Sequence, residues 1–163
     1  RLSRTEFTPA EIDMDRALTD ALDLSTSRLR EYGVQVRRPR PLPKARADFD
    51  RMSEVFANLI GNAIKYNDKP ERWVEIGYRD GAAEEPVVYY VRDNGIGIAA
   101  EHRDLIFRIF KRLHERDKFG GGVGAGLTIV RKIIERHGGR IWVESVPGEG
   151  TTFCFTLNSG GTE

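Results

Sequence analysis

The chain has 163 residues, of which 39% are hydrophobic and 31% charged, values typical of one folded domain rather than of a disordered segment. Its 26 basic and 25 acidic side chains leave a formal net charge of +1, so overall charge favours neither nucleic acid nor a membrane surface as a partner. No apolar run approaches the roughly 18 residues that indicate a membrane-spanning helix, and the single Cys154 excludes an internal disulfide.

The chain begins at Arg1 without an initiator Met, and we expect it to be a domain excised from a longer protein. We predict a single domain over residues 1–157, followed by a C-terminal tail over 158–163. The composition predicts a reducing, aqueous compartment, the cytoplasm, whether the longer protein is soluble or anchored in a membrane.

The first quarter of the chain predicts one helix and one short strand. Apolar residues recur at helical spacing from Asp13 to Glu31, with Asp13 as the N-cap. Residues 34–36 are a strand candidate. The proline-rich run 39–43 cannot continue a helix or a central strand, so we interpret it as a connector.

The second helix has the clearest pattern. Asp48 or Asp50 can cap its N-terminus. Seven apolar residues fall on one stripe over more than three turns: Met52, Val55, Phe56, Leu59, Ile60, Ala63 and Ile64. At ~100° per residue, four polar residues gather in a ridge on the other side: Glu54, Asn58, Asn62 and Lys65.

Two segments rich in β-branched and aromatic residues follow, Trp73–Arg79 and Pro86–Asp93, and the small polar residues between them predict a hairpin. A glycine-bearing turn then leads to a short helix from about Ala99 to Phe110. A polar, glycine-rich stretch comes next and ends at Gly126.

The last part of the chain predicts a third long helix, from Leu127 to His137, stopped by two glycines. Strands over residues 140–146 and 151–157 follow, joined by a tight turn. Long helices mixed with adjacent antiparallel strands predict an α+β fold. We expect a two-layer α/β sandwich in which a mixed, mostly antiparallel sheet of about five strands packs on three helices.

The polar ridge of the second helix has two interpretations. Most polar stripes are solvated helix faces. Asn, however, is a poor helix former, and Asn58 and Asn62 in mid-helix carry a small cost that a site can offset. A neutral amide oxygen can ligand Mg²⁺ beside nucleotide phosphates, and Lys65 can balance a phosphate oxygen. The ridge alone leaves both interpretations open.

Asp93 ends a predicted strand and begins the run Asp-Asn-Gly-Ile-Gly. Ordinary turns use the same residues, so the pattern by itself is weak. An Asp at the end of a strand can nevertheless accept a hydrogen bond from an adenine amine, as a fixed acceptor in an apolar pocket.

The run Gly120–Gly126 is either a flexible linker or an anion site. Glycines at a helix start let backbone N–H groups and the positive end of the helix dipole approach phosphate closely. No Gly-Lys-Ser/Thr ends the run, which excludes a P-loop, and no strand precedes it, which argues against a dinucleotide-binding fingerprint.

Five motifs occur in one order along the chain: residues 58–66 (Asn-Leu-Ile-Gly-Asn-Ala-Ile-Lys-Tyr), 93–97, 107–110 (Phe-Arg-Ile-Phe), 122–127 and 148–153. Together they cover nearly the whole chain from Asp48 to Leu157. This set resembles the ATP-binding catalytic domain of sensor histidine kinases, in the GHKL superfamily with the Bergerat ATP-binding fold. The segment Arg136–Ser145 is similar to the phytochrome-like kinases.

The resemblance implies a catalytic set made of Asn58, Asn62, Lys65 and Arg112. In the family, the amide matching Asn62 ligands Mg²⁺, the amide matching Asn58 lies nearby, and Lys65 would meet phosphate. Residues 111–121 correspond to the ATP lid of the family. The cations of this lid would meet the terminal phosphate: Lys111, Arg112 and Arg116.

The resemblance also implies the nucleotide contacts. Asp93 would bind the adenine amine, with Thr151 supporting it through a water, and Tyr66 would pack against the base. Further ATP-binding positions come in two groups. The purine pocket would include Gly95, Gly97 and Ile98, and the phosphate end would include Gly122, Gly124, Gly126 and Leu127.

Related ATPases of this superfold carry a Glu at the position of Asn58, where it activates water. An amide cannot act as a general base at neutral pH, so we expect slow ATP hydrolysis. None of His102, His114 and His137 is placed to accept a phosphoryl group, which implies an acceptor histidine on an absent dimerisation domain.

The other expected partners are a response regulator downstream and a second copy of the longer protein, with the fragment itself monomeric. We expect no nucleic-acid partner and no direct membrane contact by this domain. Two alternatives stay open: a gyrase-like or chaperone-like ATPase module, and an anti-sigma-like serine kinase.

Overall fold

The computed structural model describes residues 6–82, 84–99 and 123–157, and the side chains of 123–125 are outside the described set. The predicted short helix from residue 100 onward, the lid cations and the C-terminal tail therefore lie outside the described residues. The division into a domain over 1–157 and a tail stays a prediction.

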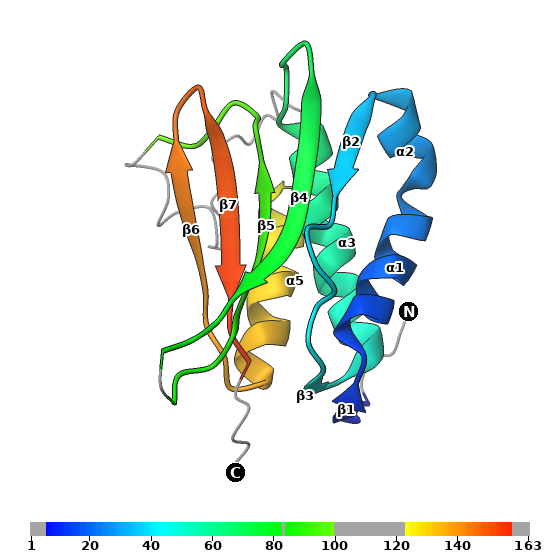
Figure 1. Ribbon diagram of the computed structural model, residues 1–163, viewed down its shortest axis with the longest axis vertical. Helices are drawn as coiled ribbons and strands as arrows, with labels where there is room; N and C mark the ends of the chain where they lie inside the picture. The colour runs from blue at the N-terminus through cyan, green and yellow to red at the C-terminus, as the bar shows by residue number, and fades with distance from the viewer. Residues whose placement is uncertain (1–5, 83, 100–122, 158–163) are drawn as a thin grey trace.

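Five strands form the main sheet, in the order β2-β4-β5-β7-β6 (Figure 1). Strand β2 pairs with β4 in parallel, and all other pairs in this sheet are antiparallel. The strand bounds are β2 (Val34–Arg37), β4 (Arg72–Arg79), β5 (Val88–Asp93), β6 (Ile141–Val146) and β7 (Gly150–Phe155). The predicted mixed, mostly antiparallel sheet of five strands is confirmed.

Helices cover one face of this sheet (Figure 1). Helices α3 (Phe49–Lys65) and α5 (Val123–Arg136) pack side by side, and α3 also contacts β4 and β5. Helix α1 (Met14–Leu24) packs against α3, and α2 (Thr26–Glu31) contacts β2. The α+β sandwich is thus confirmed. None of the described helices is both long and apolar enough to cross a membrane.

The single helix predicted from Asp13 to Glu31 was wrong, because the chain forms two helices that meet at Ser25. Ser25 has φ −100° and ψ 3°, and its N–H donates to the carbonyl of Leu22 at 3.0 Å. The Thr26 hydroxyl also donates to Leu22 O, at 3.1 Å. Hydroxyl side chains compete with the helical hydrogen-bond pattern, which is consistent with the break here.

A small second sheet was missed by the sequence reading. Strand β1 (Ala10–Ile12) pairs antiparallel with β3 (Ala45–Ala47), and each strand has three residues. Three residues are too few to show an alternating pattern. The pairing places the N-terminal segment beside the start of α3.

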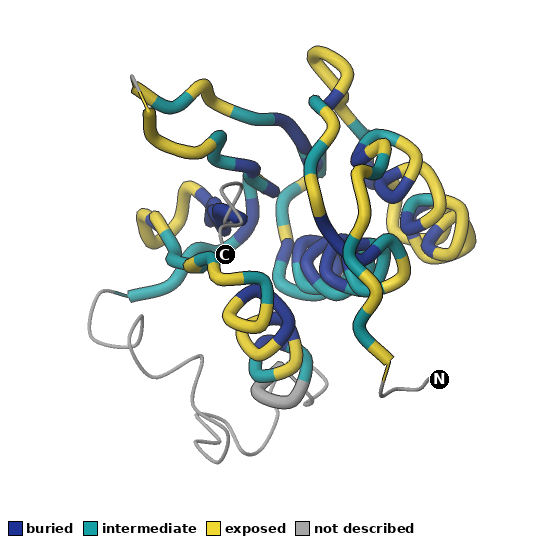
Figure 2. The backbone as a smooth tube through the Cα atoms, turned by 90° about the horizontal axis from the view of Figure 1, so that it is seen from below, coloured by how far each residue is buried: buried dark blue, intermediate teal, exposed yellow. Residues whose placement is uncertain are grey.

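Helix α3 provides the centre of the hydrophobic core. Asp48 is its N-cap and accepts from the backbone N–H of Arg51 at 3.0 Å. All seven residues of the predicted apolar stripe are buried, so the polar ridge is turned away from the core. Figure 2 colours these buried residues dark blue along the backbone. Burial of each large apolar side chain stabilises the fold by roughly 1.5–3 kcal/mol.

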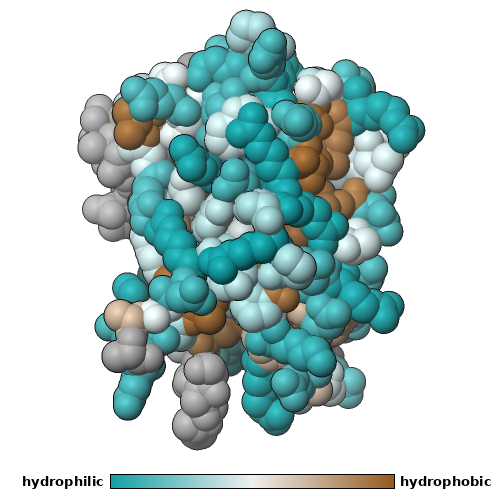
Figure 3. Space-filling model, viewed as in Figure 1, coloured by the Kyte–Doolittle hydropathy of each residue, from teal (hydrophilic) through white to brown (hydrophobic). Residues whose placement is uncertain are grey.

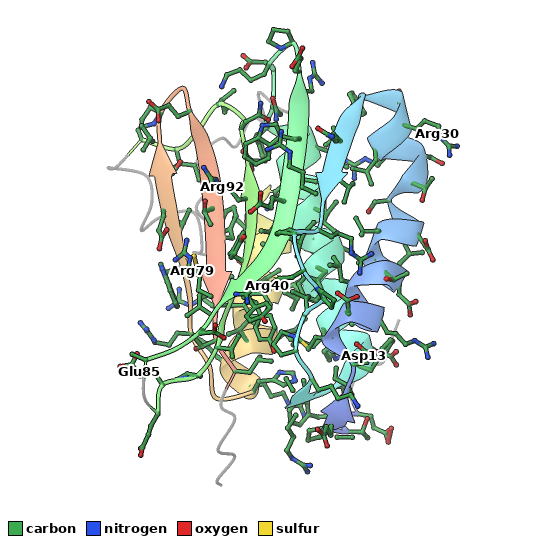
Figure 4. The ribbon with its side chains drawn as sticks, viewed as in Figure 1. Asp13, Arg30, Arg40, Arg79, Glu85 and Arg92 are labelled. Atoms are coloured by element: carbon green, nitrogen blue, oxygen red, sulfur yellow. The ribbon has the colours of Figure 1, made fainter. Side chains whose placement is uncertain are left out.

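The other face of the sheet is open to solvent and mostly hydrophilic (Figure 3). Arg79 and Arg92 lie on this face (Figure 4), where Arg79 pairs with Glu144 at 3.2 Å and Arg92 lies 5.5 Å from the Trp73 ring.

Cys154 is buried on β7, and burial raises its pKa to about 12. A packing role for this cysteine, as predicted, agrees with that position.

His137 joins the end of α5 to the start of α3. Its Nε2 accepts from the backbone N–H of Asp48 at 3.0 Å, and its Nδ1 lies 2.8 Å from the carbonyl of Ile133. These partners require a neutral ring with the proton on Nδ1, and burial lowers the pKa of His137 accordingly. His137 therefore has the structural role at a helix end that the sequence indicated.

Candidate nucleotide-binding site

Asp93 is the last residue of β5, and its side chain is held in one orientation. The residue is 8% exposed, and its Oδ1 accepts from two backbone N–H groups, those of Gly95 at 2.8 Å and Thr151 at 3.3 Å. No described residue donates a hydrogen bond to Oδ2. The carboxylate therefore keeps one oxygen for an external donor.

Burial raises the pKa of Asp93 to about 6, although the two backbone hydrogen bonds and the positive charge of Lys69 act in the opposite direction. The carboxyl is thus ionised at neutral pH but at a desolvation cost. A donor that reaches Oδ2 would offset part of that cost, because a hydrogen bond to the ionised form stabilises a carboxylate that burial has partly removed from water.

The sheet places three polar side chains in a row beside this carboxylate. Asp93 pairs with Thr151 across β5 and β7, and Thr151 pairs with Ser145 across β7 and β6. The Ser145 and Thr151 hydroxyl oxygens lie 3.0 Å apart, and Ser145 Oγ also donates to Gly150 O at 2.8 Å. Strand pairing therefore unites residues 58 positions apart along the chain.

Backbone N–H groups of the loop after Asp93 donate hydrogen bonds to two other segments of the chain. Ile96 N–H donates to Tyr66 O at 3.0 Å, and Ile98 N–H donates to Ser145 Oγ at 2.7 Å. Gly97 has φ +79°, a conformation that favours glycine, and a side chain at Gly95 would collide with Tyr66 O. The two glycines predicted to shape the purine pocket are thus required by the backbone of this loop.

Three polar residues at this end were missed by the sequence reading: Asn67, Lys69 and Ser145. Asn67 Nδ2 donates to Asn94 Oδ1 at 2.8 Å, which ties the segment after α3 to the loop after β5. Lys69 Nζ donates to Gly148 O at 2.8 Å, in the turn between β6 and β7. None of the three stands in a repeating pattern. The polar cluster that follows α3 could have indicated Asn67 and Lys69, whereas Ser145 lies in β6 and the sequence offered no signal for it.

The phosphate end of the candidate site lies on the polar ridge of α3. Asn58 Nδ2 donates to Glu54 O at 2.9 Å, and its Oδ1 faces α5, where a Cβ at Gly126 would lie 3.0 Å away. Asn62 follows one turn later, and its Nδ2 is buried without a hydrogen-bond partner in the described structure. The ridge is therefore not a simple solvated face.

Lys65 and Tyr66 end α3 between the two ends of the site. Lys65 Nζ lies 5.9 Å from the centre of the Tyr66 ring. Burial, and then the nearby charge of Arg28, lower the pKa of Lys65. The backbone of Tyr66 joins the two ends, because its N–H donates to Asn62 O at 3.0 Å while its carbonyl accepts from Ile96.

Other predicted residues differ in what the structure shows. Leu127 is buried in the hydrophobic core at 1% exposure, so its contact with a nucleotide stays a prediction. Gly124, in the second half of the glycine-rich run, lies in the first turn of α5. Four predicted residues lie outside the described set: Lys111, Arg112, Arg116 and Gly122.

The chain's own residues fit a Mg²⁺ ion that is shared with phosphates. Within the described ranges, no group of three His, Cys, Asp or Glu side chains could hold a metal by itself. Mg²⁺ commonly takes one or two protein ligands and completes its shell with phosphate oxygens and water. The buried Nδ2 of Asn62 has no hydrogen-bond partner among the described residues, and the oxygen of this amide is the atom that would ligand the ion.

Comparison with known proteins gives the class of this domain. Residues 47–160 match the sequence model of the family described as histidine kinase-, DNA gyrase B-, and HSP90-like ATPase. The chain is 53% identical over 157 residues to cyanobacterial phytochrome B of Nostoc sp., covering 96% of the chain and 21% of that protein. It is 41% identical to phytochrome-like protein Cph1 of Synechocystis sp., covering 94% of the chain and 20% of that protein.

Solved structures agree with this match. The catalytic domain of histidine kinase ThkA superposes with a TM-score of 0.76 at 28% identity, covering 95% of this chain and 97% of that chain. Full-length ShkA, solved in complex with AMPPNP, superposes with a TM-score of 0.77 at 28% identity, covering 95% of this chain and 32% of that chain.

The chain therefore belongs to the histidine kinase-, DNA gyrase B-, and HSP90-like ATPase family. Within that family it is a histidine kinase catalytic domain, similar to those of cyanobacterial phytochromes. It spans about a fifth of the length of these curated relatives.

Proposed function

We propose that this domain binds Mg²⁺-ATP and transfers its terminal phosphoryl group to a histidine on a separate dimerisation domain of a two-component sensor kinase. The observation that carries the proposal is the single available oxygen of Asp93. Two backbone N–H groups hold Oδ1, so Oδ2 is directed to accept the exocyclic amine of adenine. Guanine presents a carbonyl at the corresponding position, which a carboxylate repels, so the same geometry selects adenine.

The residues of α3 would act at the other end of the nucleotide. Asn62 would hold the metal through its amide oxygen, with Asn58 beside it. Held there, Mg²⁺ would supply positive charge that offsets the negative charge developing during transfer. Lys65 would contribute a positive charge one turn further on, and the N-terminus of α5 would present backbone N–H groups to phosphate.

Transfer to a histidine rather than to water follows from the chemistry of Asn58. A general base must accept a proton, and an amide cannot do so at neutral pH. In this structure the Asn58 amide is also oriented by its own hydrogen bond to Glu54 O. The domain therefore binds ATP without activating water and requires an imidazole placed in line with the terminal phosphate.

The acceptor is proposed to lie on another part of the longer protein. His137 is half-buried and both of its ring nitrogens are engaged at the helix junction, so it cannot reach a phosphate. We propose that the complete protein is a homodimeric, cytoplasmic-side kinase that passes its phosphoryl group to a response regulator. The lengths of the relatives, of which this chain spans about a fifth, support a larger multidomain parent.

The test is phosphoryl transfer from ATP labelled on its terminal phosphate. The chain is incubated with Mg²⁺-ATP and with the histidine-bearing dimerisation domain of its own parent protein, and the same domain with its histidine replaced by Gln is the control. We expect acid-labile, base-stable phosphate on the histidine and slow ATP hydrolysis by the chain alone. Rapid unstimulated hydrolysis would instead support the ATPase alternative, and acid-stable phosphoserine on a partner would support the serine-kinase alternative.

A further inference from the structure

The side chain of Lys69 has all of its hydrogen-bonding capacity committed to backbone carbonyls. An ammonium group has three donors. Lys69 Nζ donates to Asn94 O at 2.9 Å, to Gly95 O at 3.0 Å and to Gly148 O at 2.8 Å. A surface lysine usually keeps its charged end in water. Three carbonyl partners therefore indicate a specific role for this one.

These carbonyls belong to the two chain segments that form the adenine end of the site. Asn94 and Gly95 directly follow Asp93, and Gly148 lies in the turn that leads into β7 and Thr151. The same two segments share one further hydrogen bond, from Gly148 N–H to Ile96 O at 2.7 Å. Lys69 thus joins the loop after Asp93 to the turn before Thr151. Each of these two segments provides one backbone N–H donor to the Asp93 carboxylate.

Lys69 is itself held in place by the segment after α3. Its N–H donates to Asn67 Oδ1 at 2.9 Å, and its carbonyl accepts from Arg72 Nε at 2.9 Å. Asn67 also donates to Asn94 Oδ1 at 2.8 Å. The lysine is therefore anchored to the segment that continues the Asn-bearing helix, and its side chain extends from there to the purine end.

We propose that Lys69 is a positioning residue for adenine recognition, which fixes the Asp93 loop against the Gly148 turn and keeps a positive charge beside the carboxylate. This inference rests on the proposed nucleotide site and adds to it a residue outside the motifs that define the resemblance. Its charge also opposes the effect of burial on the pKa of Asp93, and among the described residues it is the charged side chain that acts on that carboxyl.

The test measures ADP affinity by calorimetry, from pH 5 to pH 8, for the wild-type chain and for Lys69→Met. Lys44→Met is the matched control, because Lys44 is exposed and has no partner among the described side chains. We expect Lys69→Met to weaken ADP binding about tenfold, since three charge-assisted hydrogen bonds are lost. The pH at which binding is half lost should also move upward, because Asp93 loses a stabilising positive charge.

Chemical rescue separates positioning from simple destabilisation. Alkylating Lys69→Cys with 2-bromoethylamine restores an ammonium on a side chain of nearly the original length. Native Cys154 is buried and its pKa is raised to about 12, so it is protected from the reagent in the folded chain. We expect the alkylated variant to recover ADP affinity and the original pH midpoint, while the unalkylated variant resembles Lys69→Met.

The possible results lead to distinct conclusions. Wild-type affinity and an unchanged pH midpoint for Lys69→Met would overturn the role of Lys69 alone, whereas a wild-type chain that fails to bind ADP would overturn the proposed function as well. Should Lys69→Met not fold, Lys69→Arg keeps the charge. That variant should retain the pH midpoint while its affinity falls, and a shifted midpoint would contradict the proposal.

Discussion

The two ends of the candidate site differ in how many of their polar groups already have partners within the protein. At the purine end, Asp93 Oδ1, Ser145 Oγ and Lys69 Nζ each make two or more hydrogen bonds. At the phosphate end, Asn62 Nδ2 is buried with no partner among the described residues. The hydrogen bonds of the purine end are therefore formed without a ligand, whereas the phosphate end keeps a buried N–H group that has no acceptor among the described residues.

This difference agrees with the different tasks that we propose for the two ends. Recognition of a rigid, planar base requires an acceptor at a fixed position, so a preformed hydrogen-bond network favours selectivity. Phosphate and metal bring their own charges, so the residues that meet them must keep donors and acceptors available. We therefore expect mutations at the purine end to abolish nucleotide binding, whereas mutations at the phosphate end should change how nucleotide affinity depends on the metal.

The largest effect is expected for Asp93→Asn. An amide has one acceptor and one donor end, so it cannot both accept from Gly95 and Thr151 N–H groups and accept from adenine. We expect ADP affinity to fall by about a hundredfold or more, because the amide N–H group of the variant would face the amine donor of adenine in a buried site. Calorimetry with ADP measures it, with circular dichroism to confirm folding. Unchanged affinity would remove Asp93 from the site.

Asn62→Ala should separate the two ends. We expect the affinity for Mg²⁺-ATP to fall by about tenfold or more while metal-free ADP binding changes little, because only the metal contact is removed. Calorimetry with and without EDTA provides the comparison. Equal losses for both ligands would mean that Asn62 supports the fold rather than the metal.

The same substitution also has an expected effect on stability. Removing a buried amide without a partner relieves a penalty of roughly 1–3 kcal/mol, which offsets the packing lost with the side chain. Thermal unfolding of Asn62→Ala without ligand should therefore occur at or above the wild-type temperature. A clear decrease would show that this amide has a structural partner.

The titration of Asp93 gives two readouts of opposite sign. Its pKa is raised to about 6 in the folded chain from an ordinary value of 3.8, so the folded state binds this proton more tightly than the unfolded state. The contribution of Asp93 to folding stability therefore increases as pH falls from about 6 toward 4. ADP binding should weaken over the same window, by about tenfold between pH 7 and pH 5, because protonation of Oδ2 replaces the acceptor with a donor.

The measurement compares wild type with Asp93→Asn by denaturant unfolding and calorimetry at each pH. Subtracting the variant removes the contributions of other carboxyl groups. If stability and ADP affinity fell together on acidification, the raised pKa would not be that of Asp93.

The smallest effect is expected for Ser145→Ala. Ser145 Oγ accepts from Ile98 N–H and donates to Gly150 O, but the strand pairing around it remains. We expect a loss of about 1 kcal/mol in unfolding free energy and a few-fold decrease in ADP affinity. Chemical denaturation and calorimetry measure both, with Thr19→Ala on the exposed side of α1 as a control. A loss as large as that of Asp93→Asn would mean that Ser145 contacts the nucleotide directly.

Local pattern was sufficient for much of the fold. The apolar stripe of α3 and the strands rich in β-branched and aromatic residues could be predicted because they depend on residues a few positions apart, and the cap of α3 could be narrowed to Asp48 or Asp50. The break at Ser25 could not, because the apolar spacing continues across it while hydroxyl groups compete for the same carbonyl. The β1–β3 ladder could not either, since it joins segments that are each three residues long.

For the proposed site, the sequence by itself was enough to predict the candidate residues: the two amides of α3, Asp93 and the glycines of its loop. Only the tertiary structure decided how they are oriented. The two N–H groups on Asp93 Oδ1 come from separate segments, and Lys69 reaches carbonyls up to 79 positions away. Such contacts have no sequence periodicity, because they arise from strand register and loop packing rather than from the spacing of residues along one element.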